Sequence, residues 1–428
     1  MPMDTVSFRD LSVAETDTKT LLEHATQQGI QRRYEDFLIV DVDGHHYENM
    51  SYAEIIQYIE DPVMRDQAKY QGYGSGGITS ATSGGGYQNL MGRVTRNPRV
   101  NSESTPPSPH RDITLTKRWM DAMGIDVVCL FPTPMLTLGL TPRPEVEVAL
   151  SRAYNSWLCD KVLTQEPRIR STLYLPLNDP EATYKMAKDF VGRKGVVGFT
   201  IVSPHYKAVY DNAYMKTYAL LEEAGLPLVF HGAYAWGGDK SLELCNKFIA
   251  VHALGFVWFN AIHMTNWLCN GMPERFPKLK TVWIESGLAW IPFLMQRLDN
   301  EWMMRSSEVP LLKRRPSDYM REMYYTSQPM ELVDNLEALQ VTFKMMNARS
   351  QLLFSSDYPH WDMDLPSTIY DLSFLTEQGR RNILGGNAQR LFKLEPELSA
   401  AKLGRRAAAP SQEPPELRKV FNISGTSA

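Results

Sequence analysis

One pattern repeats eight times along the chain: a short apolar run rich in β-branched residues is followed by a segment of helical character. Continuous apolar runs of this length are typical of strands buried on both faces, as in a parallel sheet. Because eight such strand–helix units follow one another, the sequence predicts a closed (β/α)8 TIM barrel. The expected strands are residues 37–40, 126–131, 169–175, 195–202, 226–231, 279–285, 322–327 and 351–357.

An open, doubly wound sheet is the alternative arrangement of the same elements. The dinucleotide-binding version of that fold carries a glycine fingerprint after its first strand, and this chain lacks it there. The barrel therefore remains the favoured fold. The expected helices are residues 51–59, 115–123, 145–164, 181–191, 212–224, 242–270, 288–301 and 332–346, with a closing helix that ends at 391.

A long glycine-rich insertion, at about 60–112, follows the first strand. A phosphate-binding loop is not expected, because no Gly-Lys-Ser or Gly-Lys-Thr follows the glycines. Loops after barrel strands emerge on the active face, so we expect its irregular part, residues 70–112, to be a lid or a subunit contact. A polar lead-in at 1–36 precedes the barrel at 37–394, and 395–428 form a flexible C-terminal tail, too rich in Ala, Pro, Ser and charge to bury a core.

Composition excludes several classes of protein. With 43% hydrophobic and 22% charged residues, the chain resembles soluble globular proteins, and its net charge of -4 without a basic block argues against nucleic-acid binding. The four cysteines are far apart in sequence, which indicates a reducing compartment without a disulfide framework. We find neither an apolar run long enough to span a bilayer nor a signal peptide, and therefore expect a cytoplasmic protein with no membrane partner.

The stretch Asp41-Val42-Asp43-Gly44-His45 ends the first apolar run with two carboxylates and a histidine. A buried strand avoids such groups unless they are paired, because burying an unpaired charge is costly. Asp43 and His45 are two residues apart and point to the same side of an extended chain. An oxygen and a nitrogen ligand side by side suit a divalent metal. The same residues are also typical of a strand that is followed by a polar turn without a metal.

Other strand ends carry similar side chains. His231 ends the fifth strand, Glu285 the sixth and Asp357 the eighth, whereas residues 200–203 at the end of the fourth include no lysine or glutamate. The active site of a barrel lies at the carboxyl ends of its strands, so these side chains should meet the strand-one pair on one face. The sequence therefore predicts a metal site there.

These segments also resemble a known family. The chain is similar to the amidohydrolase superfamily, in particular to the branch containing aminocarboxymuconate-semialdehyde decarboxylase and the resorcylate and carboxyvanillate decarboxylases. The resemblance runs from Asp41 to Phe392 and leaves out the glycine-rich segment and both ends. It is carried by residues 41–48 (DVDGHHYE), 226–231 (LPLVFH), 276–280 (FPKLK), 285–287 (ESG), 354–360 (FSSDYPH) and 383–392 (ILGGNAQRLF).

The resemblance implies a ligand set. Asp43 and His45 match the strand-one pair, whose first member is usually His or Glu, and His231 matches the strand-five ligand. Asp357 matches the strand-eight aspartate, which binds the metal and accepts a proton from metal-bound water. The bridging residue of two-metal branches has no match on strand four, which favours one divalent metal. We expect Zn2+, with Fe2+ or Mn2+ as alternatives, and a homodimer or higher homo-oligomer.

Glu285 departs from the pattern, because decarboxylases of this branch usually carry an acid–base histidine at that position. The carboxylate has three interpretations: a general base whose pKa is raised by burial, a ligand that binds the metal or bridges a second one, or a structural partner of Arg297. The first two make Glu285 functional.

Further residues are candidates for catalysis or substrate binding. His263, in the helix before the sixth strand, is a candidate catalytic residue if helical spacing brings it to the barrel mouth, and a packed helix residue otherwise. His46 points away from His45 and is not expected to be a ligand. Beyond the site strands, Trp236, Trp290 and His360 are the expected substrate contacts, and Tyr234 and Trp361 are candidates for an aromatic wall, although rim aromatics often only pack.

Our leading functional hypothesis is a metal-dependent hydrolase. Metal-activated water would attack an amide, ester or thioester of a small, aromatic or apolar substrate, with Asp357 and Glu285 taking the water proton. Glu285 in place of the histidine favours this reading. The alternative, favoured by the overall resemblance, is a non-oxidative decarboxylase of an aromatic or unsaturated carboxylic acid. A non-catalytic binding barrel ranks third, because an open ligand set resembles catalytic metal sites.

Overall fold

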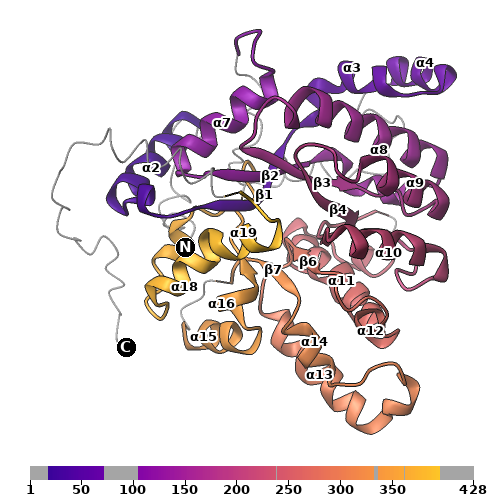
Figure 1. Ribbon diagram of the computed structural model, residues 1–428, viewed down its shortest axis with the longest axis vertical. Helices are drawn as coiled ribbons and strands as arrows, with labels where there is room; N and C mark the ends of the chain where they lie inside the picture. The colour runs from indigo at the N-terminus through magenta and orange to yellow at the C-terminus, as the bar shows by residue number, and fades with distance from the viewer. Residues whose placement is uncertain (1–17, 72–104, 238, 332–335, 361, 396–428) are drawn as a thin grey trace.

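Eight parallel strands form one sheet in sequence order, which confirms the (β/α)8 barrel (Figure 1). The computed structural model describes residues 18–71, 105–237, 239–331, 336–360 and 362–395. Helices surround the sheet, as expected when each strand is followed by a crossover. The strands are β1 (Val40–His46), β2 (Val127–Pro132), β3 (Ile169–Tyr174), β4 (Val196–Val202), β5 (Leu228–His231), β6 (Thr281–Ile284), β7 (Tyr324–Thr326) and β8 (Leu352–Leu353).

Backbone hydrogen bonds between β1 and the segment after β8 bring the two ends of the sheet together. The Val42 amide donates to the Phe354 carbonyl at 2.9 Å, and the Asp357 amide donates to the Asp43 carbonyl at 2.7 Å. Of the strand expected at 351–357, only β8 has regular strand structure. The segment that follows β8 makes backbone hydrogen bonds to β1. These bonds set Asp43 beside Asp357 although more than 300 residues separate them in sequence.

Most helices agree with the expected positions to within a few residues, except where turns interrupt them. The single closing helix expected up to 391 is wrong, because that segment forms the separate short helices Ser367–Tyr370, Glu377–Arg381 and Asn387–Leu391. The expected helix 145–164 ends as an α-helix at Leu158 and continues as a π turn, Cys159–Leu163, and 242–270 divides into a 3-10 turn and α11. The α-helices are α2 (Thr18–Gln31), α3 (Tyr52–Ile55), α4 (Pro62–Gln71), α7 (Arg111–Met123), α8 (Pro144–Leu158), α9 (Pro180–Phe190), α10 (Met215–Ala224), α11 (Phe248–Cys269), α12 (Met272–Arg275), α13 (Trp290–Arg305), α14 (Pro316–Met320), α15 (Leu336–Met345), α16 (Ala348–Gln351), α17 (Ser367–Tyr370), α18 (Glu377–Arg381) and α19 (Asn387–Leu391). The 3-10 turns are η1 (Tyr34–Asp36), η2 (Glu48–Ser51), η3 (Ile56–Tyr58), η5 (Pro134–Leu140), η7 (Asn212–Tyr214), η8 (Leu242–Leu244) and η9 (Ser306–Glu308), and η10 (Asn382–Gly386) is a second π turn.

The apolar residues of the strands divide between two layers. In β2, Val127, Cys129 and Phe131 belong to one apolar cluster, and Val128 and Leu130 belong to the larger cluster that includes residues of the surrounding helices. This alternation follows from the two-residue period of a strand, which sends successive side chains to opposite faces. Side chains from both faces are thereby removed from water.

Strand β1 extends further than expected. The sequence predicts a strand over 37–40, whereas β1 runs from Val40 to His46 and includes the acidic motif. The strand accommodates Asp41 because its carboxylate accepts hydrogen bonds from the Ser356 amide at 2.9 Å, the Ser356 hydroxyl at 2.5 Å and the Asp43 amide at 3.0 Å. Burial raises the pKa of Asp41 to about 7, although these hydrogen bonds oppose the rise. Paired in this way, a carboxylate can lie inside a strand.

Helix α11 corrects one expectation from the sequence. It is 22 residues long with a mean hydropathy of 1.4, so by length and composition alone it could span a membrane. No apolar run of that length was expected from the sequence. One side of α11 packs on the barrel through buried Asn260 and His263, while Leu254 and Trp258 are exposed. The absence of a membrane partner stays a prediction.

Much of the insertion and of both chain ends lies outside the described residues, namely 1–17, 72–104 and 396–428. The proposed lid or subunit contact, the flexible tail and the domain limits therefore stay predictions. The described flanks of the insertion are helical, since α4 ends at Gln71 and α7 begins at Arg111.

Candidate active site and metal centre

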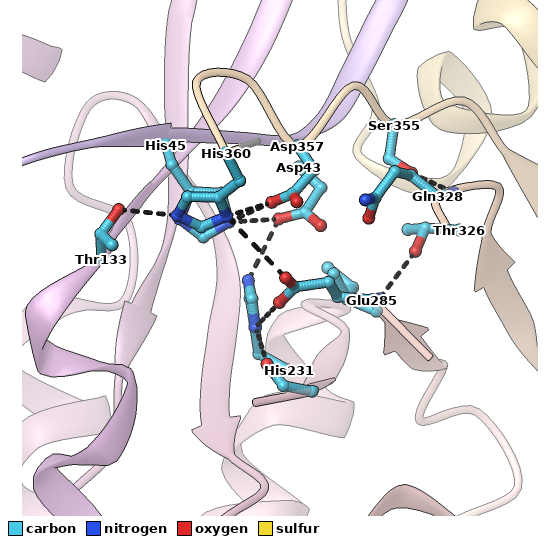
Figure 2. Close-up of polar contacts among 12 residues, drawn as sticks. Asp43, His45, Thr133, His231, Glu285, Thr326, Gln328, Ser355, Asp357 and His360 are labelled. Carbon is cyan, nitrogen blue, oxygen red and sulfur yellow. Dashed lines mark hydrogen bonds and ion pairs between the residues drawn. The ribbon is translucent and has the colours of Figure 1, made fainter. Parts of the chain in front are cut away.

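Four side chains predicted as metal ligands meet at the carboxyl ends of the strands (Figure 2). Asp43 and His45 lie on β1, His231 ends β5, and Asp357 follows β8. Asp43 Oδ1 lies 3.1 Å from the Nε2 atoms of both His45 and His231, and Asp357 Oδ1 lies 3.2 Å from His45 Nε2. The structure thus brings together residues that the sequence separates by more than three hundred positions.

Hydrogen bonds to the backbone fix how the two histidines face this cluster. His45 Nδ1 lies 3.0 Å from the Pro132 carbonyl oxygen, and His231 Nδ1 lies 2.7 Å from the Gly232 carbonyl oxygen. Because a carbonyl oxygen only accepts, each Nδ1 carries the proton and each Nε2 presents a lone pair to the cluster. Metal-binding histidines are oriented in the same way in known sites.

Several atoms of the cluster are buried without a hydrogen-bond partner among the described residues. They are Asp43 Oδ2, His45 Nε2, Asp357 Oδ2 and Glu285 Oε2. Leaving such a group unsatisfied costs about 1–3 kcal/mol, more if it is charged. Ligand atoms of Asp43, His45, His231 and Glu285 lie within 4.8 Å of one another. This donor set, oxygen and nitrogen together, fits a divalent cation.

The electrostatics of the cluster favour a cation as well. Burial raises the pKa of Glu285 well above its ordinary value, and Asp43 and Asp362 add to the rise. Burial likewise raises the pKa of Asp357, with further contributions from nearby carboxylates, first among them Glu285. For Asp43, burial alone would also raise the pKa, but His231 and His45 outweigh it and hold the pKa below its usual range. Neighbouring buried carboxylates repel one another, and a bound cation relieves this repulsion.

Glu285 lies beside the cluster at the end of β6. Its Oε2 is 3.4 Å from His231 Nδ1, its Oε1 is 3.8 Å from His360 Nδ1, and its amide donates to Thr326 Oγ1 at 3.1 Å. The ends of β5 and β6 approach closely here: a Cβ atom on Gly232 would lie 2.5 Å from the Glu285 carbonyl oxygen. Only glycine at that position allows His231 and Glu285 to be neighbours.

The predicted pairing of Glu285 with Arg297 is wrong. Arg297 lies on the exposed side of α13 and pairs with Glu301, with 3.4 Å between the charged atoms. One helix turn separates these two residues, so the local i,i+4 pair forms in place of the distant one. The catalytic and metal-binding interpretations of Glu285 remain.

Both Glu285 and Asp357 have left-handed backbone conformations, with φ of 57° and 56°. Such a conformation costs a residue other than glycine about 1–3 kcal/mol and is retained where the surrounding structure enforces it, often at functional sites. Two strained carboxylates on opposite sides of one buried cluster are the kind of feature that a catalytic site explains.

The metal content of the Glu285→Gln variant decides between the two remaining roles of Glu285. We expect one divalent metal per chain in both parent and variant, because four other donors complete a site. Elemental analysis of the two purified proteins measures this. Near two metals in the parent and one in the variant would instead make Glu285 a ligand of a second ion.

His360 was expected to contact substrate. The structure places it behind Asp357, with its ring 5% exposed, its Nδ1 2.6 Å from Asp357 Oδ1 and its Nε2 3.2 Å from Thr133 Oγ1. Its ring centroid lies 4.3 Å from that of His45. Both ring nitrogens therefore have partners within the protein, and contact with substrate stays a prediction.

His263 lies on α11 rather than within the cluster. Its Nε2 donates to the Ser203 carbonyl at 2.8 Å, and its ring stacks on that of His205, with 4.4 Å between centroids. Burial lowers the pKa of His263 to about 4, although the hydrogen bond to Ser203 opposes this. The structure describes a packed, neutral histidine, and its expected catalytic role is untested.

The two tryptophans expected to bind substrate have their indole N–H groups bonded to backbone carbonyls. Trp236 Nε1 donates to Cys245 at 2.9 Å, and Trp290 Nε1 donates to Gly287 at 3.0 Å. Their role in substrate binding stays a prediction, and Trp361 lies outside the described residues. His46, as expected, points away from the cluster and contacts Asp112 and Tyr154 instead.

Sequence reasoning missed three residues that support the site. Asp41 bonds to Ser356 near Asp357, while Glu48 accepts hydrogen bonds from the loop that carries Thr133. Asp41 and Glu48 belong to the same polar stretch, residues 41–48, as two of the proposed ligands but were given no role. Thr133 directly follows β2, so reading every strand end for polar side chains would have found it.

Several known proteins resemble this chain in sequence or in fold. The profile of a family described as amidohydrolase matches residues 117–394. The gamma-resorcylate decarboxylase of Polaromonas sp. (strain JS666) is 25% identical over 288 residues, which cover 65% of this chain and 86% of that protein. An amidohydrolase from Mycobacterium avium subsp. paratuberculosis has a similar structure, with a TM-score of 0.60 at 19% identity, covering 83% of this chain and 99% of that one.

A second solved structure is a dihydroxybenzoic acid decarboxylase from Polaromonas sp. JS666 with bound manganese and the inhibitor 2-nitroresorcinol. Its TM-score is 0.58 at 19% identity, and the match covers 85% of this chain and 99% of that one. At these identities the two structural matches support the fold.

Proposed function

This chain belongs to the amidohydrolase family, and from that premise we propose that it is a metal-dependent decarboxylase of an aromatic carboxylic acid with a hydroxyl group beside the carboxylate. The observation that carries the proposal is the similarity to gamma-resorcylate decarboxylase along 65% of the chain. The buried donor set at the barrel mouth supports it, because such a site can bind an acid through two adjacent oxygens. Decarboxylation thereby replaces hydrolysis as the leading hypothesis.

The residues that would hold the cation are Asp43, His45, His231 and Asp357. When bound there, a divalent cation supplies Lewis-acid chemistry that offsets the negative charge of the substrate's carboxylate and phenolic oxygens. Manganese, present in a structural relative, is as compatible with the two carboxylates and two imidazoles as zinc is.

The reaction itself needs little more than proton delivery. The bond between the ring carbon and the carboxyl carbon breaks, its electron pair stays on the ring carbon, and a proton takes the place of the departing carbon dioxide. The two carboxyl groups placed to carry that proton are those of Asp357 and Glu285, whose Oδ2 and Oε2 atoms have no hydrogen-bond partner in the described part of the chain. The backbone bonds of His45 and His231 keep the imidazoles fixed meanwhile.

Aromatic side chains close to the cluster suit an aromatic substrate. The Phe131 ring lies edge-on to His231 at 4.7 Å between centroids, and the Tyr47 ring lies 6.5 Å from that of His360. Edge-to-face contacts of this kind would also be available to a planar ring in the site.

Hydrolysis is the second candidate, and Glu285 is the observation that favours it. A carboxylate at the position of the usual histidine, 3.4 Å from His231, can take a proton from water as a general base. The attacked group would be an amide, ester or thioester.

Isotope labelling separates the two reactions. We expect 2,6-dihydroxybenzoate or a related hydroxybenzoate to release carbon dioxide, and in D2O to give a product with one deuterium on the carbon that lost the carboxylate. Mass spectrometry of the product, together with carbon dioxide detection, measures both. If hydroxybenzoates are inert while an ester or amide takes up oxygen-18 from labelled water, the chain is a hydrolase.

A further inference from the structure

Three side chains, one from the segment after β2 and two from the segment after β8, form a hydrogen-bonded line to the candidate metal centre (Figure 2). Thr133 Oγ1, after β2, lies 3.2 Å from His360 Nε2, and His360 Nδ1 lies 2.6 Å from Asp357 Oδ1. All three residues come from loops at the carboxyl ends of the strands, and His360 and Asp357 are almost fully buried. Hydrogen bonds in such surroundings are stronger than in water.

The direction of the two bonds follows from the groups involved. When a cation is bound, Asp357 is a carboxylate and only accepts, so His360 Nδ1 carries the proton and donates it to Asp357. Nε2 then presents a lone pair, which accepts the hydroxyl proton of Thr133. The Asp357 carboxylate thus fixes the Nδ1-protonated tautomer of His360, and the Thr133 hydroxyl donates to the Nε2 of that tautomer.

The backbone of Thr133 is held in place by another buried side chain. Glu48, which is fully buried after β1, accepts from the Thr133 amide at 2.9 Å through Oε2 and from the Met135 amide at 2.8 Å through Oε1. Both oxygens of one carboxylate therefore hold the loop after β2. Charge-assisted bonds of this type are about twice as strong as neutral ones.

The line distinguishes the two oxygens of Asp357. Oδ1 accepts from His360 and also lies 3.2 Å from His45 Nε2, whereas Oδ2 has no hydrogen-bond partner in the described part of the chain. A carboxylate held at one oxygen keeps its second oxygen in a fixed direction, which proton transfer requires. Without His360 the carboxylate of Asp357 would lose this hydrogen bond and could rotate about its Cβ–Cγ bond.

We propose that Thr133 is a positioning residue, which acts through His360 to hold Asp357 in the orientation that the reaction needs. The expected effect on kcat rests on the function proposed above. The hydrogen bonds between Thr133, His360 and Asp357 can be tested without turnover. The loop after β2, fixed by Glu48, thereby becomes part of the catalytic apparatus.

Replacing Thr133 by valine removes the hydroxyl and keeps the shape of the side chain. We expect kcat of the metal-loaded protein to fall by about 10–100-fold, the range for residues that orient metal ligands, with little change in KM or metal content. The Thr133→Ser variant keeps a hydroxyl and should regain most of the activity. The matched control is Thr342→Val on α15, a buried threonine whose hydroxyl bonds to the Ala338 carbonyl at 2.9 Å, and it should behave as the parent.

The tautomer of His360 gives a second readout that needs no substrate. In the metal-loaded parent labelled with 15N-histidine, NMR should show His360 protonated at Nδ1 only, with the signals assigned from the His360→Gln spectrum. In the Thr133→Val variant the 15N resonance of His360 Nε2 should shift, because this nitrogen loses its hydrogen bond from the threonine hydroxyl.

Three results would overturn the proposal: an Nε2-protonated His360 in the parent, parental kcat in Thr133→Val, or a serine variant as impaired as the valine one. If instead no hydroxybenzoate is decarboxylated by the parent, the proposed function fails while the NMR result still decides the role of Thr133.

Discussion

The Asp357→Asn variant is expected to keep its fold and lose turnover by about 10²–10⁴-fold, the range for removal of a general acid or base. Asparagine has the same shape as aspartate and can still accept from His360 Nδ1, which now lies 2.6 Å from Oδ1. It cannot, however, deliver or accept a proton at the position of Oδ2. Turnover per metal-loaded chain measures this effect, and metal content is determined in parallel because Asp357 is also a proposed ligand.

The control for this variant is Asp126→Asn. Asp126 is also a buried aspartate, but it lies just before β2, at the opposite end of the barrel, and accepts from the Ile39 amide at 2.8 Å. An asparagine oxygen can make the same bond, so activity should stay near that of the parent. Substantial turnover by metal-loaded Asp357→Asn would exclude Asp357 as the proton carrier and leave Glu285 as the remaining candidate.

The second large effect is expected for His231→Ala, which should bind the metal far more weakly than the parent and lose activity with it. His231 Nε2 lies 3.1 Å from Asp43 Oδ1 at the centre of the cluster, and alanine offers no donor atom in its place. Losing one of four ligands should weaken binding by more than the roughly 10–100-fold cost of losing an outer-shell partner. Equilibrium dialysis against manganese or zinc, with elemental analysis, measures the change.

Thermal unfolding provides an independent check on His231. A cation that binds only the folded parent at about a hundred times its Kd stabilises it by about 2.7 kcal/mol, so Tm should rise on metal addition and fall with a chelator. His231→Ala should show little of this response. The control is His24→Ala on α2, far from the cluster, where the response should match the parent; a full metal response in His231→Ala would remove His231 from the ligand set.

The placement of the proposed ligands could be predicted from the sequence because two local periodicities were sufficient. Apolar runs separated by helices indicate parallel strands, and in a closed barrel all strand ends lie on one face. Asp43, His45, His231 and Asp357 each end or follow such a run, so their meeting follows from counting strands. This prediction does not depend on the exact lengths of the strands. It therefore holds although β8 is shorter and β1 longer than expected.

The partners of Glu285 could not be predicted in this way. From sequence alone, Arg297 was a reasonable partner, but its side chain lies on the outer side of α13, where Glu301 one turn away is closer. The neighbours that Glu285 does have, His231 and His360, depend on how closely β5 and β6 approach at Gly232. Such side-chain distances are set by packing between strands rather than by spacing along the chain.

The sequence by itself determined the barrel, its family and the residues that gather at its mouth, since these depend on periodicity and on the identity of strand-end residues. Only the tertiary structure decided what each residue contacts: that Asp41 is held by Ser356, that His263 packs against His205, and that Thr133 reaches Asp357 through His360. These contacts join elements that are far apart in the sequence, and their relative positions are set when the barrel closes between β1 and the segment after β8. Hydrogen bonds require a few tenths of an ångström of accuracy, and that accuracy comes from the packed core.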